Sequence, residues 1–261
     1  MLKRLLTALV SVPLILAVLW FGNVWWTIAI LAISVAGGYE MFGMLDKGGF
    51  RPARLLGMVW IMLLVLRVIP PLDSVPLTTV LTGGLIATFI YAMYSPEKPL
   101  ITWLGTSAGA IYLGVTLSQL AGLRFLEDGM WWVFFALLTA WGNDTVAYFV
   151  GVTLGKHKIW PRFSPKKSWE GTIGGWIGAA LIAGAIAHFS PLPMSFGAAA
   201  IVGAVAGVLA FYGDISISLV KRQVGVKDSG NLFPGHGGML DRLDSLLFVF
   251  PFIYQIALIW K

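Results

Sequence analysis

Nine apolar stretches follow one another along the chain, separated by short polar connections. A helix needs about 20 apolar residues to cross the hydrocarbon core of a membrane. These runs are too long and too continuous for barrel strands, which leaves helices as the spanning structure. We therefore predict an all-α, polytopic integral membrane protein with about nine transmembrane helices, at residues 5–21, 24–45, 55–72, 76–94, 100–123, 130–153, 172–189, 196–219 and 244–260.

The composition agrees with this class and excludes several others. Hydrophobic residues make up 58% of the 261 residues, against about 45–50% in soluble domains, and the mean hydropathy is +0.84. The chain has no cysteine, which excludes disulfides, thiolate nucleophiles and cysteine-ligated metal sites. The net charge of +6 does not indicate nucleic-acid binding, because the cations lie in short loops between apolar runs.

The distribution of the cations predicts the orientation of the chain. With the N-terminus in the cytoplasm, 15 of the 18 lysines and arginines fall on the cytoplasmic side, and Arg67, Arg124 and Lys261 fall outside. Cytoplasmic loops of membrane proteins carry such an excess of positive charge. We therefore predict a cytoplasmic N-terminus, with residues 5–21 kept as a first span rather than removed as a signal peptide.

One polar connection differs from an ordinary loop in its chemistry. Residues 218–244 read SLVKRQVGVKDSGNLFPGHGGMLDRLD and combine cations, carboxylates and five glycines. Glycine allows positive φ and lets backbone amides approach a ligand closely. Together with the lysines and arginines, this mixture indicates a site for a polyphosphate and its metal ion at the membrane surface.

Three acids lie inside predicted spans, where an ionisable residue is costly and indicates a function. They are Glu40, Asp144 and Asp214, and none lies towards the outer end of its span. Structural alternatives remain for each of them. Glu40 could pair with a loop cation at the interface, and Asp144 could be a hydrogen-bonded core acid.

Two further acids, Asp241 and Asp244, stand three residues apart at the predicted start of the last span. This spacing places both on one face of a helix. With Asp214 from the preceding span, they offer hard oxygen ligands of the kind that Mg²⁺ uses. The alternative is that they complement the positive end of the helix. Arg242 would bind a phosphate oxygen or hold one of the acids.

A second cytoplasmic connection, residues 155–175, reads GKHKIWPRFSPKKSWEGTIGG. Lys166 and Lys167 precede the next helix and would form an anion site there. Ser168 is a plausible N-cap of that helix, which is a structural explanation for the residue. Neither the GxxxxGK[ST] phosphate loop nor a GxGxxG turn is present.

The motifs in these two connections resemble the phosphatidate cytidylyltransferase (CDP-diacylglycerol synthase) family. The family pattern runs Ser-x-apolar-Lys-Arg, four residues, Lys-Asp, then His-Gly-Gly and Asp-Arg-apolar-Asp. Its defined positions are filled here by Ser218, Lys221, Arg222, Lys227, Asp228, His236, Gly237, Gly238, Asp241, Arg242 and Asp244. The stretches Asn143-Asp144 and 164–171 also resemble the family, with Ser168 where threonine is expected.

The resemblance implies that CTP and phosphatidic acid react to CDP-diacylglycerol and pyrophosphate, with Mg²⁺ and room for a second cation. It implies catalytic roles for Asp214, Lys221, Arg222, Asp241, Arg242 and Asp244, of which the three acids form the metal centre. Substrate binding would fall to Asp144, Lys166, Lys167, Ser168, Ser218, Lys227, Asp228, His236, Gly237 and Gly238. The chain would form a single integral membrane domain over 1–261, with scaffold spans in 1–130 and the catalytic spans and loops in 131–261.

Two other functions are weighed against this one. A CTP-dependent lipid kinase would transfer the γ-phosphate and would need a hydroxyl acceptor. A polytopic transporter would use the buried acids but gives no reason for the glycine-rich loop. Whichever holds, we expect a multi-pass protein of the cell membrane whose active site faces the cytoplasm. Small-residue spacings such as Gly174/Gly178 and Gly203/Gly207 favour packing within the chain, with a homodimer as the alternative.

Overall fold

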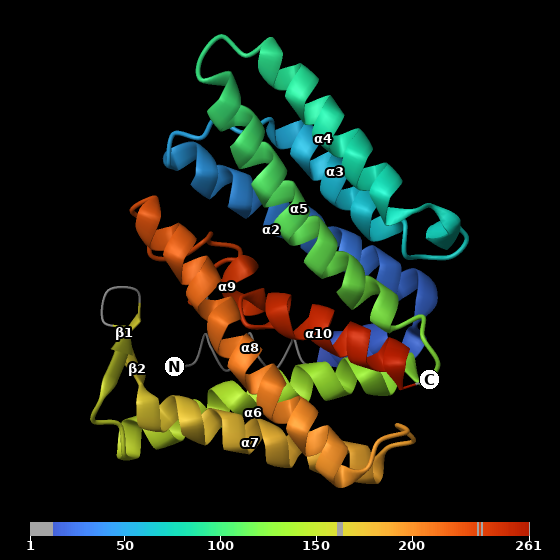
Figure 1. Cartoon of the computed structure of the whole chain (residues 1–261), viewed down its shortest axis with the longest axis vertical. Helices are drawn as coiled ribbons and strands as arrows, with labels where there is room; N and C mark the ends of the chain where they lie inside the picture. Colours follow the sequence, from blue (N-terminus) through green and yellow to red (C-terminus); the bar gives the residue numbers. More distant parts are fainter. Residues whose placement is uncertain (1–12, 161–163, 234, 236, 261) are drawn as a thin grey trace. The chain divides into compact units, whose positions relative to one another are not determined.

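The computed structural model describes residues 13–160, 164–233, 235 and 237–260. Within these residues the chain is an all-α membrane protein, apart from one short hairpin (Figure 1). Five helices are long and apolar enough to cross a membrane, namely α2 (Asn23–Lys47), α5 (Pro99–Leu123), α6 (Gly129–Thr153), α7 (Trp169–Phe189) and α8 (Phe196–Gln223). Three shorter apolar helices are α3 (Arg54–Leu66), α4 (Leu77–Met93) and α10 (Leu246–Ile259).

Each predicted span coincides with one of these helices, except the first, of which residues 13–21 are helical and residues 1–12 lie outside the described part. The third predicted span is shorter than expected, because α3 ends at Leu66 and a short 3-10 helix, η1 (Leu72–Ser74), follows it. Pro70 and Pro71 lie between them, and proline cannot continue the hydrogen-bond pattern of a helix.

The chain divides into two compact units. Unit 1 comprises Met1–Phe125 and Val220–Arg242, and unit 2 comprises Leu126–Leu219 and Leu243–Lys261. In unit 1, α5 packs against α2, α3 and α4. The polar segment 220–242 belongs to this unit, although the sequence analysis grouped it with the second half of the chain.

Glycines bring the helices of unit 2 into direct contact. A Cβ added to Gly174 or Gly178 of α7 would come within 2.8 or 2.6 Å of a valine side chain on α6. On α8, a Cβ added to Gly203 would lie 2.4 Å from the side chain of Ala183 on α7. These small residues therefore serve packing within the chain, as predicted.

A two-stranded antiparallel hairpin, formed by β1 (Lys158–Trp160) and β2 (Ser164–Ser168), precedes α7. No pattern in the sequence predicted this hairpin. At its end Ser168 is the N-cap of α7, since its Oγ accepts a hydrogen bond from the amide of Gly171 at 3.3 Å. The predicted cap is thus confirmed, and it fixes the position of Lys167 directly before the helix.

Candidate active site

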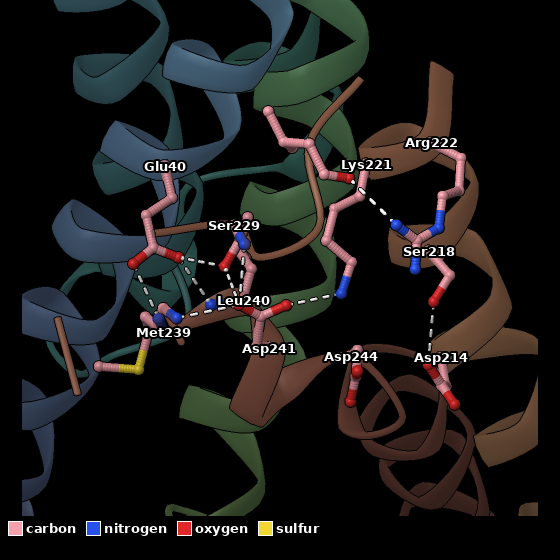
Figure 2. Close-up of polar contacts among 12 residues, drawn as sticks. Glu40, Asp214, Ser218, Lys221, Arg222, Ser229, Met239, Leu240, Asp241 and Asp244 are labelled. Carbon is pink, nitrogen blue, oxygen red and sulfur yellow. Dashed lines mark hydrogen bonds and ion pairs between the residues drawn. The ribbon is translucent and has the colours of Figure 1, made fainter. Parts of the chain in front are cut away.

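The polar segment of unit 1 folds around two carboxylates, Glu40 from α2 and Asp241 from α9 (Leu240–Leu243) (Figure 2). Glu40 is 8% exposed. Its Oε1 accepts a hydrogen bond from the amide of Met239 at 2.8 Å. Its Oε2 accepts from the amide of Leu240 at 2.9 Å and from the hydroxyl of Ser229 at 2.8 Å.

Asp241 has a comparable set of donors. Its Oδ2 accepts from the amide and the hydroxyl of Ser229, at 2.8 and 2.9 Å, and from the amide of Gly238 at 2.9 Å. Its Oδ1 pairs with the ammonium of Lys221 at 2.6 Å, and the two side chains are only 8% and 10% exposed. Burial acts to raise the pKa of Asp241, but the hydrogen bonds from Lys221, Gly238 and Ser229 together hold this pKa below its ordinary value.

The glycines of this segment serve two different purposes. Gly225, Gly235 and Gly237 have φ near +75°, at +74°, +78° and +79°, which confirms the predicted need for positive φ. Gly230 and Gly238 instead make room for Glu40, because an added Cβ would lie 2.5 or 2.4 Å from its Oε1. The segment's backbone was expected to approach a ligand closely. In the structure it approaches the protein's own carboxylates.

The chain does not continue as one helix from Asp241 into the last span. The four-residue α9 ends at Leu243, residues 244–245 form a turn, and α10 starts at Leu246. The amide of Ser245 donates to Oδ1 of Asp244 at 2.8 Å, a local hydrogen bond that competes with helical pairing. The prediction that Asp241 and Asp244 share the face of one helix is therefore wrong.

In unit 2, an ion pair joins the hairpin to α8. The ammonium of Lys167 lies 2.5 Å from Oδ2 of Asp214, and the two side chains are 27% and 30% exposed. The same ammonium stands 4.6 Å from the ring centroid of Phe211, one turn earlier on α8. Ser218 donates to Oδ1 of Asp214 at 3.3 Å. The structure thus brings together three predicted site residues, Lys167, Asp214 and Ser218.

The other two predicted site acids of unit 2, Asp244 and Asp144, lie in the turn before α10 and on α6. A Cβ added to Gly213 would lie 2.5 Å from the carbonyl oxygen of Asp244, so α8 passes close to this turn. Oδ2 of Asp144 accepts from the hydroxyl of Ser245 at 3.2 Å, and Oδ1 accepts from the side-chain amide of Asn143 at 3.1 Å. Asp144 is therefore hydrogen-bonded, but it is exposed, so the alternative of a core acid is confirmed only in its hydrogen bonds.

The remaining predicted residues lie mostly at the surface. Arg222 is exposed, and its guanidinium donates to the carbonyl oxygen of Val226 at 3.5 Å. Side chains that the structure leaves exposed also include Lys166, Lys227, Asp228 and Arg242. His236 lies outside the described residues. Exposed cations of this kind are free to meet an anionic substrate.

Within the described part of the chain, no group of three or more acidic or histidine side chains is arranged to hold a metal ion. Asp241 belongs to unit 1, and Asp214 and Asp244 belong to unit 2. The chemistry of the three residues fits Mg²⁺, since carboxylate oxygens are its preferred ligands. A metal centre built from them stays a prediction.

Sequence reasoning missed two features of the polar segment. Ser229 had no assigned role, although its hydroxyl and amide make three of the hydrogen bonds described above. Glu40 was noticed as a buried acid, but the alternative that it pairs with a loop cation is wrong for the residues that the structure describes, where its donors are two amides and a hydroxyl. Its partners lie 189 to 200 residues away in the sequence, where local patterns carry no signal.

Comparisons with known proteins cover the whole chain. Residues 2–260 match the cytidylyltransferase family. The chain is 31% identical to a phosphatidate cytidylyltransferase of Bacillus subtilis, over 99% of this chain and 98% of the relative. It is 35% identical to one of Brucella abortus, over 98% of this chain and 93% of the relative. It is 29% identical to one of Synechocystis, over 98% of this chain and 96% of the relative. The chain belongs to the cytidylyltransferase family.

Proposed function

We propose that this chain is a membrane enzyme that condenses CTP with phosphatidic acid to give CDP-diacylglycerol and pyrophosphate. The observation that carries the proposal is the match of residues 2–260 to the family, together with relatives of nearly equal length that are named phosphatidate cytidylyltransferase. The match spans both units, including the ion pairs Lys221–Asp241 and Lys167–Asp214.

The reaction joins two anions, so charge neutralisation matters more than proton transfer. An oxygen of the lipid phosphate, already anionic at neutral pH, attacks the α-phosphorus of CTP. The new P–O bond forms as the bond between the α-phosphorus and the bridging oxygen breaks, and pyrophosphate leaves with the electron pair. Lys167, Lys221 and Arg222 would offset the repulsion between the reactants and the charge on the leaving group.

A divalent cation fits this chemistry. Asp214 and Asp244, with Asp241, are the residues that would hold Mg²⁺, whose charge would neutralise phosphate oxygens when it is bound. In unit 2, the close approach of Gly213 to the carbonyl oxygen of Asp244 supports a shared role for Asp214 and Asp244. A second cation is an extension of the same proposal.

The proposed membrane topology has nine spans, a cytoplasmic N-terminus and an active site that faces the cytoplasm. It is supported by the bias of 15 cations to 3 described above. Because the chain has no cysteine, Lys227→Cys and Arg124→Cys variants can be labelled one at a time with a membrane-impermeant maleimide. Intact cells should label the Arg124 variant and spare the Lys227 variant, and the reverse pattern would invert the topology.

The activity itself is tested with purified protein, phosphatidic acid, Mg²⁺ and CTP labelled with ³²P at either the α- or the γ-position. The proposal expects α-label in the lipid fraction and γ-label in pyrophosphate. The Asp214→Asn variant should lose the transfer, because it removes a carboxylate that pairs with Lys167. Asp73→Asn is the matched control, since this exposed acid lies in η1 and belongs to neither polar connection.

Other outcomes point to the other two functions. Label from the γ-position in the lipid would indicate a kinase. CTP binding with no label in lipid, under conditions in which a relative is active, would contradict both enzymes and favour a transporter.

A homodimer is a lesser part of the proposal, because Gly174, Gly178 and Gly203 all face helices of the same chain.

A further inference from the structure

We propose that Glu40 is a positioning residue of this enzyme: its carboxylate holds residues 229–241 in the shape that orients Asp241 and Lys221. The inference rests on the proposed function, because the residues it orients are assigned to that reaction. It concerns a residue of the first 130, where no site had been assigned from the sequence. Glu40 acts through other residues and does not itself contact the substrates.

The contacts of Glu40 are those of a structural anchor for a loop. The residue is 8% exposed in the apolar part of α2, whose other charged residues, Asp46 and Lys47, lie at its last two positions. A charge in such a place is costly unless it is well satisfied. Among the described residues, its three donors come from the polar segment, namely the Ser229 hydroxyl and the amides of Met239 and Leu240. One side chain therefore fixes both ends of the stretch 229–240.

Ser229 couples Glu40 directly to Asp241. Its hydroxyl lies 2.8 Å from Oε2 of Glu40 and 2.9 Å from Oδ2 of Asp241, and its amide donates to the same Oδ2 at 2.8 Å. The residues just before Asp241 are held by Glu40 as well. A displacement of the Glu40 carboxylate would therefore move Asp241 and, through the 2.6 Å ion pair, the ammonium of Lys221.

The backbone of the segment is shaped to receive this carboxylate. A Cβ at Gly238 would lie 2.4 Å from both Glu40 oxygens, and a Cβ at Gly230 would lie 2.5 Å from one of them. Neither glycine has positive φ, so conformation alone does not require glycine there. Their lack of a side chain is explained by the approach of Glu40.

An isosteric substitution separates the hydrogen bonds from simple packing. In Glu40→Gln the side-chain volume is nearly unchanged, but one acceptor oxygen becomes an NH₂ donor. Whichever oxygen is replaced, this donor faces the amide of Met239 or of Leu240, because each carboxylate oxygen accepts from one of them. A packing role predicts no effect. A positioning role predicts a loss of kcat of about 10²-fold, the scale expected for a displacement near 1 Å, with KM for phosphatidic acid unchanged.

The same variant is examined by hydrogen exchange, which does not depend on activity. We expect faster exchange at the amides of Ser229 and Gly238 to Leu240, with wild-type exchange in α5 and a wild-type thermal midpoint. Glu97→Gln is the matched control, since Glu97 pairs with Arg51 at 2.6 Å on the surface of the same unit with 59% exposure. Such exposed pairs contribute little, so exchange and kcat should stay at wild-type values.

Ser229→Ala decides the question if Glu40→Gln does not fold. It removes the hydroxyl that bridges Glu40 and Asp241 and leaves the other donors in place, so a smaller loss of kcat and local deprotection are expected. Wild-type kcat and exchange in a folded variant would overturn the inference. If the wild-type protein showed no nucleotidyl transfer, the proposed function would fail, but the exchange experiment would still test the role of Glu40.

Discussion

The Lys221–Asp241 ion pair should respond unequally to the loss of its two partners. Both side chains are nearly enclosed, at 10% and 8% exposure, and lie 2.6 Å apart. In the described part of the chain, Asp241 has three other donors, from Ser229 and Gly238. For Lys221, the structure gives Asp241 as the ion-pair partner. The carboxylate can therefore tolerate the loss of the ammonium better than the ammonium can tolerate the loss of the carboxylate.

The magnitudes follow from this difference. Asp241→Asn leaves a buried ammonium beside an amide, and breaking a buried pair in this way costs about 3–5 kcal/mol. Lys221→Met keeps most of the length of the side chain and removes one charge-assisted hydrogen bond, which costs about 1.5–3 kcal/mol. In the double variant no buried ammonium remains. It should therefore be more stable than Asp241→Asn alone, with a coupling of about 0.5–3 kcal/mol.

Hydrogen exchange at the amides of Ser229 and Gly238 measures this locally, because it reports the free energy of opening the segment rather than of unfolding the spans. The expected order of protection is wild type, Lys221→Met, then Asp241→Asn, with the double variant above Asp241→Asn. Equal losses in the two single variants, or additive losses in the double, would refute the reasoning about the unpaired charge.

Three further predictions follow from the same contacts. Gly238→Ala should weaken the segment by about 1–3 kcal/mol through overpacking against Glu40, and this loss should shrink in a Glu40→Ala background when both are measured by hydrogen exchange. Ser168→Ala should lose the cap to Gly171 and lower stability by about 0.5–2 kcal/mol, whereas Ser168→Thr should keep the wild-type thermal midpoint. Because the pKa of Asp241 is lowered, its stabilisation is complete above the unfolded-state value of about 3.9 and is lost as the pH falls through the folded-state pKa. In the wild-type protein, protection of the segment, corrected for intrinsic exchange rates, should thus stay constant from pH 7 to 5 and decline in stronger acid. In the Asp241→Asn variant this acid-dependent decline should be absent.

The helices were predictable because a membrane imposes one strong condition on sequence. A span must be continuously apolar, so hydropathy alone located α2, α4 to α8 and α10 to within a few residues, and it missed only the early end of α3. Ser168 was likewise predictable, because an N-cap depends on neighbours three residues away. Such local or compositional signals are all present in a single sequence.

The hairpin and the end of α9 were not predictable in the same way. The strand pair β1 and β2 has three and five residues and no alternating pattern to mark it. The break at Asp244 is accompanied by a local hydrogen bond from Ser245 that competes with the helix. The same i, i+3 spacing of acids is also typical of one helix face, so the pattern favoured a continuous helix over the observed break.

The partners of Glu40 show a different limit. A carboxylate in an apolar run indicates that something satisfies it, but not what does so. Here the donors are two backbone amides and a serine, and every residue except proline offers a backbone amide. The link from the segment's glycines to a phosphate ligand stays a prediction. That Gly230 and Gly238 make room for the protein's own Glu40 required the structure.

The long separation between Glu40 and its partners also has a consequence for biogenesis. The contacts join residues 189 to 200 positions apart, and ribosomes add about 5–20 residues per second. After α2 enters the membrane, roughly 10–40 s pass before Ser229 and Leu240 exist. During this interval the Glu40 carboxylate has none of these donors. The maturation of unit 1 is therefore completed only after α8 has been synthesised, and a chain that stops after α8 should be a substrate for membrane quality control.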